Sequence, residues 1–177
     1  MEQEVYRELN NLNPRKSSGP DDFTPKLLKA CASQLKYPLT VLYNKCIQEA
    51  HFPNPWKLAK VIAIYKKSCR HLAENYRPIS LLCCFGKILE KLVNKQMMKF
   101  IEKHKILYIF QYGFRKGHST THALIDIVDK IKTAIDNNEY AIGVFLDIKK
   151  AFDCINHDIL MYKLDHYGFR GHSYNFF

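Results

Sequence analysis

The residue whose type and position most suggest chemistry is Asp147, which directly follows the apolar run at residues 140–146 (YAIGVFL). The run is apolar at odd and even positions alike, which predicts a central strand of a sheet that is covered on at least one side. A carboxylate at the end of such a strand suits Mg²⁺, which prefers hard oxygen ligands and also binds phosphate oxygens. An aspartate after a strand is also a common helix N-cap or turn residue. The local pattern therefore leaves a metal ligand and a structural residue as alternatives.

A second pattern that could bind a substrate is a row of lysines on the amphipathic helix predicted at residues 85–104. They recur at every fourth position, as Lys87, Lys91, Lys95, Lys99 and Lys103. Like charges at this spacing destabilise a helix by roughly 0.2–0.5 kcal/mol per pair, and a phosphate backbone would relieve that repulsion. A solvated helix face, eased by Glu90 and Glu102, explains the lysines equally well.

The basic charge of the chain is concentrated in its middle. The net charge is +10, and residues 56–116 alone hold 14 lysines and arginines against three glutamates. The rest of the chain is nearly neutral. This distribution favours a surface for polyanions such as nucleic acid, although basic charge by itself is weak evidence for any one partner.

Composition places the chain among globular proteins of the cytoplasm or nucleus. With 177 residues, 47% of them hydrophobic, it can form one domain and the beginning of a second lobe. No apolar run approaches the roughly 20 residues that cross a bilayer, and the N-terminus lacks the order of a secretory signal, so no membrane contact is expected. The six cysteines have no zinc-site spacing and predict reduced, mostly buried thiols. The histidines likewise match no metal site and are read as surface or cap residues.

The elements that would position these residues indicate an α+β fold. Helices are predicted at residues 2–12, 25–35, 38–50 and 85–104, and after Ser119 or Thr120, where Leu124, Ile127, Val128, Ile131 and Ile135 would face inward. Pro38 is expected to start the third helix. Two β-branched runs, residues 58–66 and 76–82, predict an antiparallel pair. Pro78 in the second run indicates an edge strand or a bulge.

Several short motifs, in a fixed order, resemble those of one protein family. They are KSSGPD at 16–21, WK at 56–57, VIAIYKK at 61–67, NYRPISL at 75–81, KILEK at 87–91, QYGFR at 111–115 with Ser119 and Thr120, and FLDIKKAFD at 145–153, continued by Asn156, His157, Lys163, Leu164, Tyr167 and Gly168. The whole set resembles the N-terminal part of the reverse transcriptase domain of LINE-type (non-LTR) retrotransposons. Motifs kept in order over nearly the whole chain are far more specific than any one of them.

This resemblance implies an RNA-directed DNA polymerase that uses two Mg²⁺ ions, an RNA template, a DNA primer and deoxynucleoside triphosphates. Asp147 would ligate both metal ions, and the backbone carbonyl of Ile148 would complete the shell of one of them. Phe152 would be the steric gate that excludes the 2′-hydroxyl of a ribonucleotide. Without the resemblance, Phe152 reads as a core aromatic after the strand.

The resemblance also assigns roles to basic and polar residues. Lys66 and Arg77 match positions that reach the incoming triphosphate, where a guanidinium binds phosphate oxygens in bidentate fashion and an ammonium acts as a point charge. Exposed strand cations are the alternative. Residues near the template strand or the nucleotide pocket would be Lys16, Gln111 and Arg115, and the lysines 87, 91 and 95 would contact nucleic acid.

We expect the fingers and a partial palm of a right-hand polymerase, with residues 1–139 as the fingers and 140–177 as the start of the palm. The family requires a later pair of aspartates, whereas the only such pair here is Asp21-Asp22, near the N-terminus. The chain ends at Phe177 before that motif, so we expect no polymerase activity from this chain alone. Smaller departures are Ala63 in place of a usual proline and Asp22 in place of a usual glycine.

Two other functions are compatible with this sequence. A noncatalytic nucleic-acid-binding protein derived from such a domain would use the basic surface without chemistry. A maturase of the group II intron type would share the fold, but the motifs at residues 75–81 and 113–115 fit the LINE type better.

Overall fold

The structure is a computed structural model that describes residues 1–67, 69–149 and 151–177. The chain forms two compact units, which are described separately below. The first unit consists of residues 1–99 and 161–177, and the second consists of residues 100–160. The regular elements of the described residues are helices and one small sheet, which agrees with the predicted α+β class.

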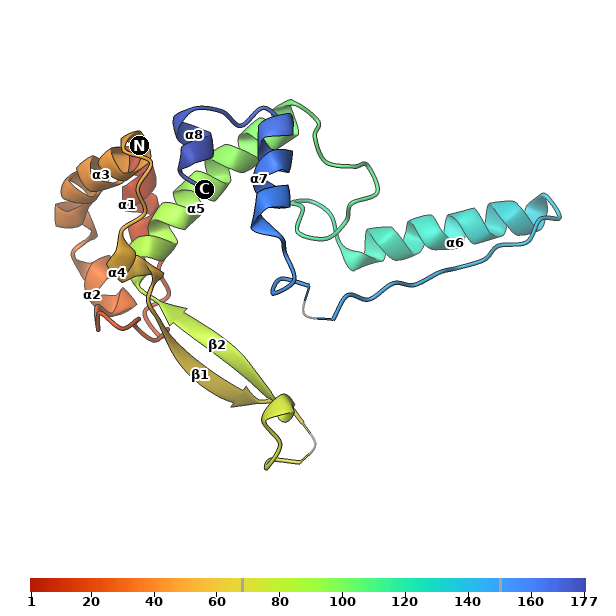
Figure 1. The fold of residues 1–177 in the computed structure, drawn as a ribbon, viewed down its shortest axis with the longest axis horizontal. Coiled ribbons are helices and arrows are strands. Elements are labelled where there is room, and N and C mark those ends of the chain that lie inside the picture. Colours follow the sequence, from red (N-terminus) through yellow and green to blue (C-terminus); the bar gives the residue numbers. More distant parts are fainter. Residues whose placement is uncertain (68, 150) are drawn as a thin grey trace. The chain divides into compact units, whose positions relative to one another are not determined.

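Three helices form the N-terminal part of the first unit (Figure 1): α1 (Glu2–Asn10), α2 (Pro25–Ala30) and α3 (Ala32–Gln48). The side chain of Thr24 caps α2 by accepting a hydrogen bond of 3.2 Å from the backbone N–H of Leu27. The prediction that Pro38 starts a helix was wrong, because Pro38 lies inside α3. Ala32 and Leu39 are both buried, so packing on either side of the proline keeps the helix continuous despite one missing backbone donor.

The hydrophobic core of the first unit lies between α1, α2, α3 and the beginning of α5 (Cys84–Lys103). Its fully buried side chains include Val5, Leu9, Leu28, Tyr43 and Leu89. The short helix α4 (Asn54–Lys57) adds Trp56, which stacks on Phe85 with ring centroids 6.4 Å apart. Near the C-terminus, α8 (His172–Asn175) is followed by Phe176, whose ring lies 6.3 Å from that of Phe52.

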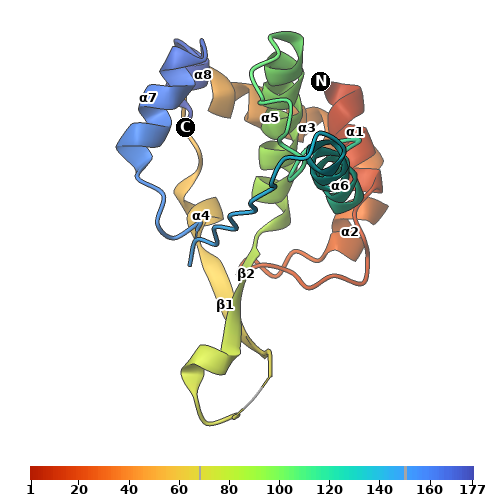
Figure 2. The same cartoon turned by 90° about the vertical axis from the view of Figure 1, so that its right-hand side faces the viewer.

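The predicted antiparallel pair is confirmed as a hairpin of β1 (Ala59–Tyr65) and β2 (Tyr76–Leu82). Figures 1 and 2 show that it projects from the helical part of its unit. Pro78 pairs with Ala63 in an uninterrupted register, which confirms an edge position rather than a bulge. Both strands of a two-stranded sheet are edges, so the missing N–H of a proline breaks no interior ladder.

The second unit contains the end of α5, the helix α6 (Thr120–Asp136) and the beginning of α7 (His157–His166). Of the two residues predicted to cap α6, Ser119 is the N-cap, and it forms a capping box with His122. The apolar side chains expected to face inward from α6 are instead 41–64% exposed. That expectation was wrong because amphipathic spacing identifies an apolar face but does not supply a packing partner.

The six cysteines are free thiols. Cys46, Cys83 and Cys84 are buried, Cys31 is half-buried, and Cys69 and Cys154 are exposed, so only half of them are buried as expected. Burial raises the pKa of the Cys83 and Cys84 thiols, and the nearby Asp21 carboxylate adds to both shifts.

Among the described helices, none has both the length and the apolar composition needed to cross a membrane.

Candidate active site

Lys66 and Arg77 lie on the same face of the hairpin. Ile64 pairs with Arg77, and the backbone N–H of Lys66 donates a hydrogen bond of 2.8 Å to the carbonyl of Asn75. Side chains two residues apart on a strand share a face, so Lys66 and Arg77 are diagonal neighbours across the pair. Both residues are exposed. The geometry places an ammonium and a guanidinium together on one exposed surface.

The loop at the tip of the hairpin is held by side chains from β2 and from the residue that precedes it. The amide of Asn75 donates to the carbonyl of Cys69 over 2.7 Å, and the hydroxyl of Tyr76 donates to the carbonyl of Arg70 over 3.0 Å. On the hairpin face opposite to Lys66, the rings of Tyr65 and Tyr76 pack with centroids 5.6 Å apart. These contacts fix the end of the hairpin where the two cations lie.

Asp147 lies in an irregular, exposed segment and not at the end of a strand. The predicted buried strand at residues 140–146 was therefore wrong, and Tyr140 at its beginning is 99% exposed. A strand needs a neighbour to satisfy its backbone groups, and the described sheet consists of β1 and β2 alone. Among the described residues, no group of three or more histidine, cysteine or carboxylate side chains is placed to hold a metal ion.

Phe152 follows Asp147 within a turn at residues 151–154. The thiol of Cys154, the last residue of this turn, lies 3.7 Å from the carbonyl of Lys149. Phe152 is 76% exposed, so the alternative of a core aromatic is wrong for this structure. Its ring contacts Phe114 edge to face, with centroids 6.2 Å apart and an interplanar angle of 85°.

The predicted template residues Gln111 and Arg115 both bind the backbone of their own loop. The amide of Gln111 donates to the carbonyl of Gly113 over 3.4 Å, and the guanidinium of Arg115 donates to the carbonyl of Tyr108 over 3.3 Å. Tyr112 connects the same loop to α6 through a hydrogen bond to Asp126. This bond, with desolvation and the Asp126 charge as smaller causes, raises the pKa of Tyr112 to about 12.

Two of the lysines on α5 are paired with glutamates of α1. Lys91 contacts Glu8, and Lys95 Nζ lies 3.6 Å from a carboxylate oxygen of Glu4. Lys91 and Lys95 are four residues apart on α5, as Glu4 and Glu8 are on α1, and the two ion pairs run in opposite sequence directions. Repulsion within the row is therefore relieved in part by the protein itself, which neither alternative for the lysines had included.

Lys16 is exposed in the loop between α1 and α2, and this loop is anchored at Gly19. A Cβ at position 19 would lie 2.5 Å from the backbone nitrogen of Cys83. The glycine thus lets the loop approach the junction between β2 and α5, which holds Lys16 within the first unit.

Comparison with known proteins identifies the family. A family model described as "Reverse transcriptase (RNA-dependent DNA polymerase)" matches residues 64–176. The chain belongs to the reverse transcriptase family. It is similar to the RNA-directed DNA polymerase from mobile element jockey of Drosophila melanogaster, with 34% identity over 91% of the chain and 18% of the relative.

Two further relatives of this reverse transcriptase chain come from transposons of the same fly. The probable RNA-directed DNA polymerase from transposon BS is 34% identical over 92% of the chain and 18% of the relative. The corresponding protein from transposon X-element is 36% identical over 90% of the chain and 17% of the relative. The resemblance to non-LTR retrotransposon polymerases is therefore confirmed. The chain spans less than a fifth of the length of these relatives.

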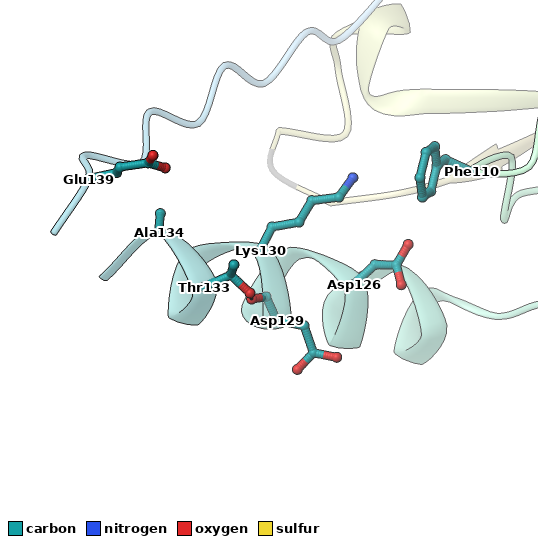
Figure 3. A pocket seen from close by; sticks show the side chains of 7 residues that line it. All are labelled: Phe110, Asp126, Asp129, Lys130, Thr133, Ala134 and Glu139. Atoms are coloured by element: carbon teal, nitrogen blue, oxygen red, sulfur yellow. The ribbon is translucent and has the colours of Figure 1, made fainter. Parts of the chain in front are cut away.

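A cavity of about 320 Å³ in this reverse transcriptase chain lies along α6 and is shown in Figure 3. Lys130 points toward the ring of Phe110, and its Nζ is 4.0 Å from the ring centroid. The remaining lining residues are Asp126, Asp129, Thr133, Ala134 and Glu139. None of the residues predicted to bind metal, nucleotide or template lines this cavity, so we do not place the active site there.

Sequence reasoning missed two contacts in the second unit and one in the first unit. They are the ring contact of Phe114 with Phe152, the bond between Tyr112 and Asp126, and the close approach of Gly19 to Cys83. Phe114 and Tyr112 lie within the QYGFR motif, so the motif was found but the contacts of its aromatic rings were not. Such contacts join residues far apart in sequence, and no local periodicity signals them.

Proposed function

We propose that this chain is the fingers and the beginning of the palm of an RNA-directed DNA polymerase from a LINE-type retrotransposon. Residues 1–139 would form the fingers and residues 140–177 the first part of the palm. The observation that carries the proposal is the family match over residues 64–176, which includes Lys66, Arg77, Asp147 and Phe152. The complete enzyme would extend a DNA primer along an RNA template with deoxynucleoside triphosphates.

In the complete polymerase, Asp147 and the carbonyl of Ile148 would be ligands of the divalent ions, which we expect to be two Mg²⁺. A carboxylate and a carbonyl are suitable oxygen donors, but a two-metal site needs further carboxylates. The described residues include no such cluster. We therefore expect no tight metal binding and no polymerase activity from the 177-residue chain alone.

Lys66 and Arg77 would bind the triphosphate of the incoming nucleotide. Their shared face on the hairpin supports this role, because two cations that point the same way can contact one polyanion.

Phe152 would act as the steric gate against ribonucleotides, and its high exposure leaves its ring accessible to a sugar. The template would pass near Lys16, Gln111 and Arg115, with Lys87, Lys91 and Lys95 contacting the nucleic-acid backbone.

The test replaces the matching segment of the jockey polymerase with this chain and measures primer extension on an RNA template. We expect the chimera to extend the primer and its Asp147→Asn variant to lose extension. Asp129→Asn, which removes a carboxylate of α6 that belongs to none of the family motifs, should retain it. The isolated chain serves as a second arm and should give no extension.

Extension that survives Asp147→Asn would exclude the proposed role of this aspartate, and extension by the isolated chain would exclude the expected inactivity. A chimera that binds RNA with steep salt dependence and without Mg²⁺, yet never extends a primer, would instead indicate a noncatalytic binding protein.

A further inference from the structure

We infer that Phe114 is a positioning residue that holds the ring of Phe152 in place. The inference rests on the proposed function, because it concerns the selection of deoxynucleotides over ribonucleotides. Phe114 lies in the loop that precedes α6, and Phe152 lies in the turn after Asp147. The two residues are 38 positions apart in sequence and belong to the same unit.

The backbone of Phe114 adopts a conformation that is unfavourable for its residue type. Its φ is 57°, in the left-handed region that glycine and asparagine occupy far more readily than a bulky aromatic residue. Its side chain is also 93% exposed, so burial of the ring does not offset this strain. Backbone strain of this kind is found most often at functional sites.

The contact that the ring makes is with Phe152. The centroids are 6.2 Å apart and the rings are nearly perpendicular, which is the favourable edge-to-face arrangement of two aromatic side chains. Phe152 is 76% exposed and lies in a turn rather than a regular element, so neither burial nor a regular element fixes its ring.

The loop that presents Phe114 is fixed on both sides of the residue. The carbonyl of Gly113 accepts a hydrogen bond from the side chain of Gln111, and the side chain of Arg115 binds the carbonyl of Tyr108. Tyr112 is bonded to Asp126 on α6. A ring held on such a loop limits the rotation of the ring that it contacts.

Selection against a 2′-hydroxyl depends on where the gate ring stands. A ring free to rotate can move aside and admit a ribose, whereas a restrained ring cannot. Phe114 would therefore affect nucleotide choice without touching the substrate. Removing its ring should lower the ratio of kcat/KM for a deoxynucleotide over a ribonucleotide by about three- to tenfold, the range for loss of one aromatic pair.

Two variants distinguish the effect of the Phe114 ring from the effect of the strained backbone at this position. Phe114→Asn supplies a residue that tolerates a positive φ but has no aromatic ring, whereas Phe114→Tyr keeps the ring and the strain. If only loop conformation matters, Phe114→Asn should behave like the unchanged chain. If the ring positions Phe152, Phe114→Asn should lose discrimination and Phe114→Tyr should retain it.

The first readout uses the 177-residue chain and does not require activity. 4-Fluorophenylalanine is introduced at position 152 and its fluorine NMR signal is recorded. We expect Phe114→Asn to shift the signal and Phe114→Tyr to shift it much less. Phe110→Asn is the matched control, because the ring of Phe110 packs on Tyr108 and Lys130 instead. A signal that is unchanged in Phe114→Asn overturns the inference.

The second readout is nucleotide discrimination in the jockey chimera. If Phe152→Val relaxes discrimination and Phe114→Asn does not, Phe152 acts as the steric gate but Phe114 has no positioning role. If Phe152→Val has no effect, the proposed gate fails, and with it the inference. If the chimera is inactive, the proposed function fails separately, and the fluorine signal alone decides whether Phe114 restrains Phe152.

Discussion

Gly19 lies so close to Cys83 that a Cβ at position 19 would stand 2.5 Å from the backbone nitrogen of Cys83. This contact joins the basic loop after α1 to the junction between β2 and α5. The atoms that this Cβ would contact are backbone atoms of Leu82 and Cys83, and backbone atoms cannot move aside as easily as a flexible side chain.

Gly19→Ala should therefore destabilise the first unit by about 1–3 kcal/mol, as expected for an overpacked site. Urea unfolding of the chain, followed by circular dichroism, measures the change. Gly113→Ala is the matched control, because a Cβ at Gly113 meets no atom within 4 Å among the described residues. Equal stability of Gly19→Ala and the unchanged chain would show that the loop does not pack on Cys83.

Tyr43 should stabilise the core through its hydroxyl as well as its ring. The hydroxyl donates a hydrogen bond of 3.0 Å to the carbonyl of Phe85, and burial raises the pKa of Tyr43 so that it stays protonated. Tyr43→Phe should lower the free energy of unfolding by about 0.5–1.5 kcal/mol. Tyr37→Phe on the same helix, where the side chain is 66% exposed, should change it very little. Similar losses for both variants would contradict a role for the hydrogen bond.

The lysines of α5 should differ in their contribution to RNA binding. Lys91 and Lys95 are paired with Glu8 and Glu4, whereas Lys99 forms no ion pair within the described residues. Lys99→Ala should therefore reduce the slope of log affinity against log salt by about 0.7, the value for one single-strand phosphate contact. Lys91→Ala should reduce it less. Filter binding of a single-stranded RNA at several salt concentrations measures both slopes, and a larger effect of Lys91→Ala would contradict this ranking.

Tyr112 should titrate at about pH 12, because the neutral phenol donates to Asp126 and the ionised phenol would lose that bond. The folded chain then holds this proton more tightly than the unfolded chain, in which a tyrosine pKa is about 10. The stabilising effect is full below about pH 10 and is lost as the pH rises through about 12. NMR of ¹³Cζ-labelled tyrosine measures the midpoint. Asp126→Asn should return it toward the ordinary value, and an unchanged midpoint would mean that the bond is absent.

The exposed apolar segment at residues 140–146 should promote self-association of the isolated chain. Its side chains are 78–99% exposed at Tyr140, Ile142, Val144, Phe145 and Leu146, and unpaired β-branched segments tend to pair with one another. Ile142→Lys combined with Val144→Lys should reduce light scattering at high protein concentration. Ser33→Lys combined with Gln48→Lys adds the same charge on α3 and should reduce it less. Equal effects would point to net charge as the cause.

Patterns confined to one element were predicted well from the sequence. The hairpin, the long helix α5 and the Ser119 cap of α6 follow from β-branched runs, amphipathic spacing and cap chemistry. The motif order also predicted the family, which the comparisons confirm. Each of these features depends on residues that are close in sequence or on their order along the chain.

The failures have a common physical cause. The run at residues 140–146 has the composition of a buried strand, but composition does not provide a neighbouring strand, and the segment is irregular and exposed. Pro38 was expected to start a helix, but buried residues on both sides keep α3 continuous. In both cases the packing partners outweighed the local preference.

The sequence by itself determined the family, the local elements and the residue types available for chemistry, because these depend on side-chain pattern and order along the chain. Only the tertiary structure decided that Lys91 pairs with Glu8, that Lys66 and Arg77 share a face of the hairpin, and that Phe114 contacts Phe152. These relationships join residues that belong to different elements or segments. They form only when the folded backbone brings the residues together, and the residue pattern within one segment does not predict such contacts.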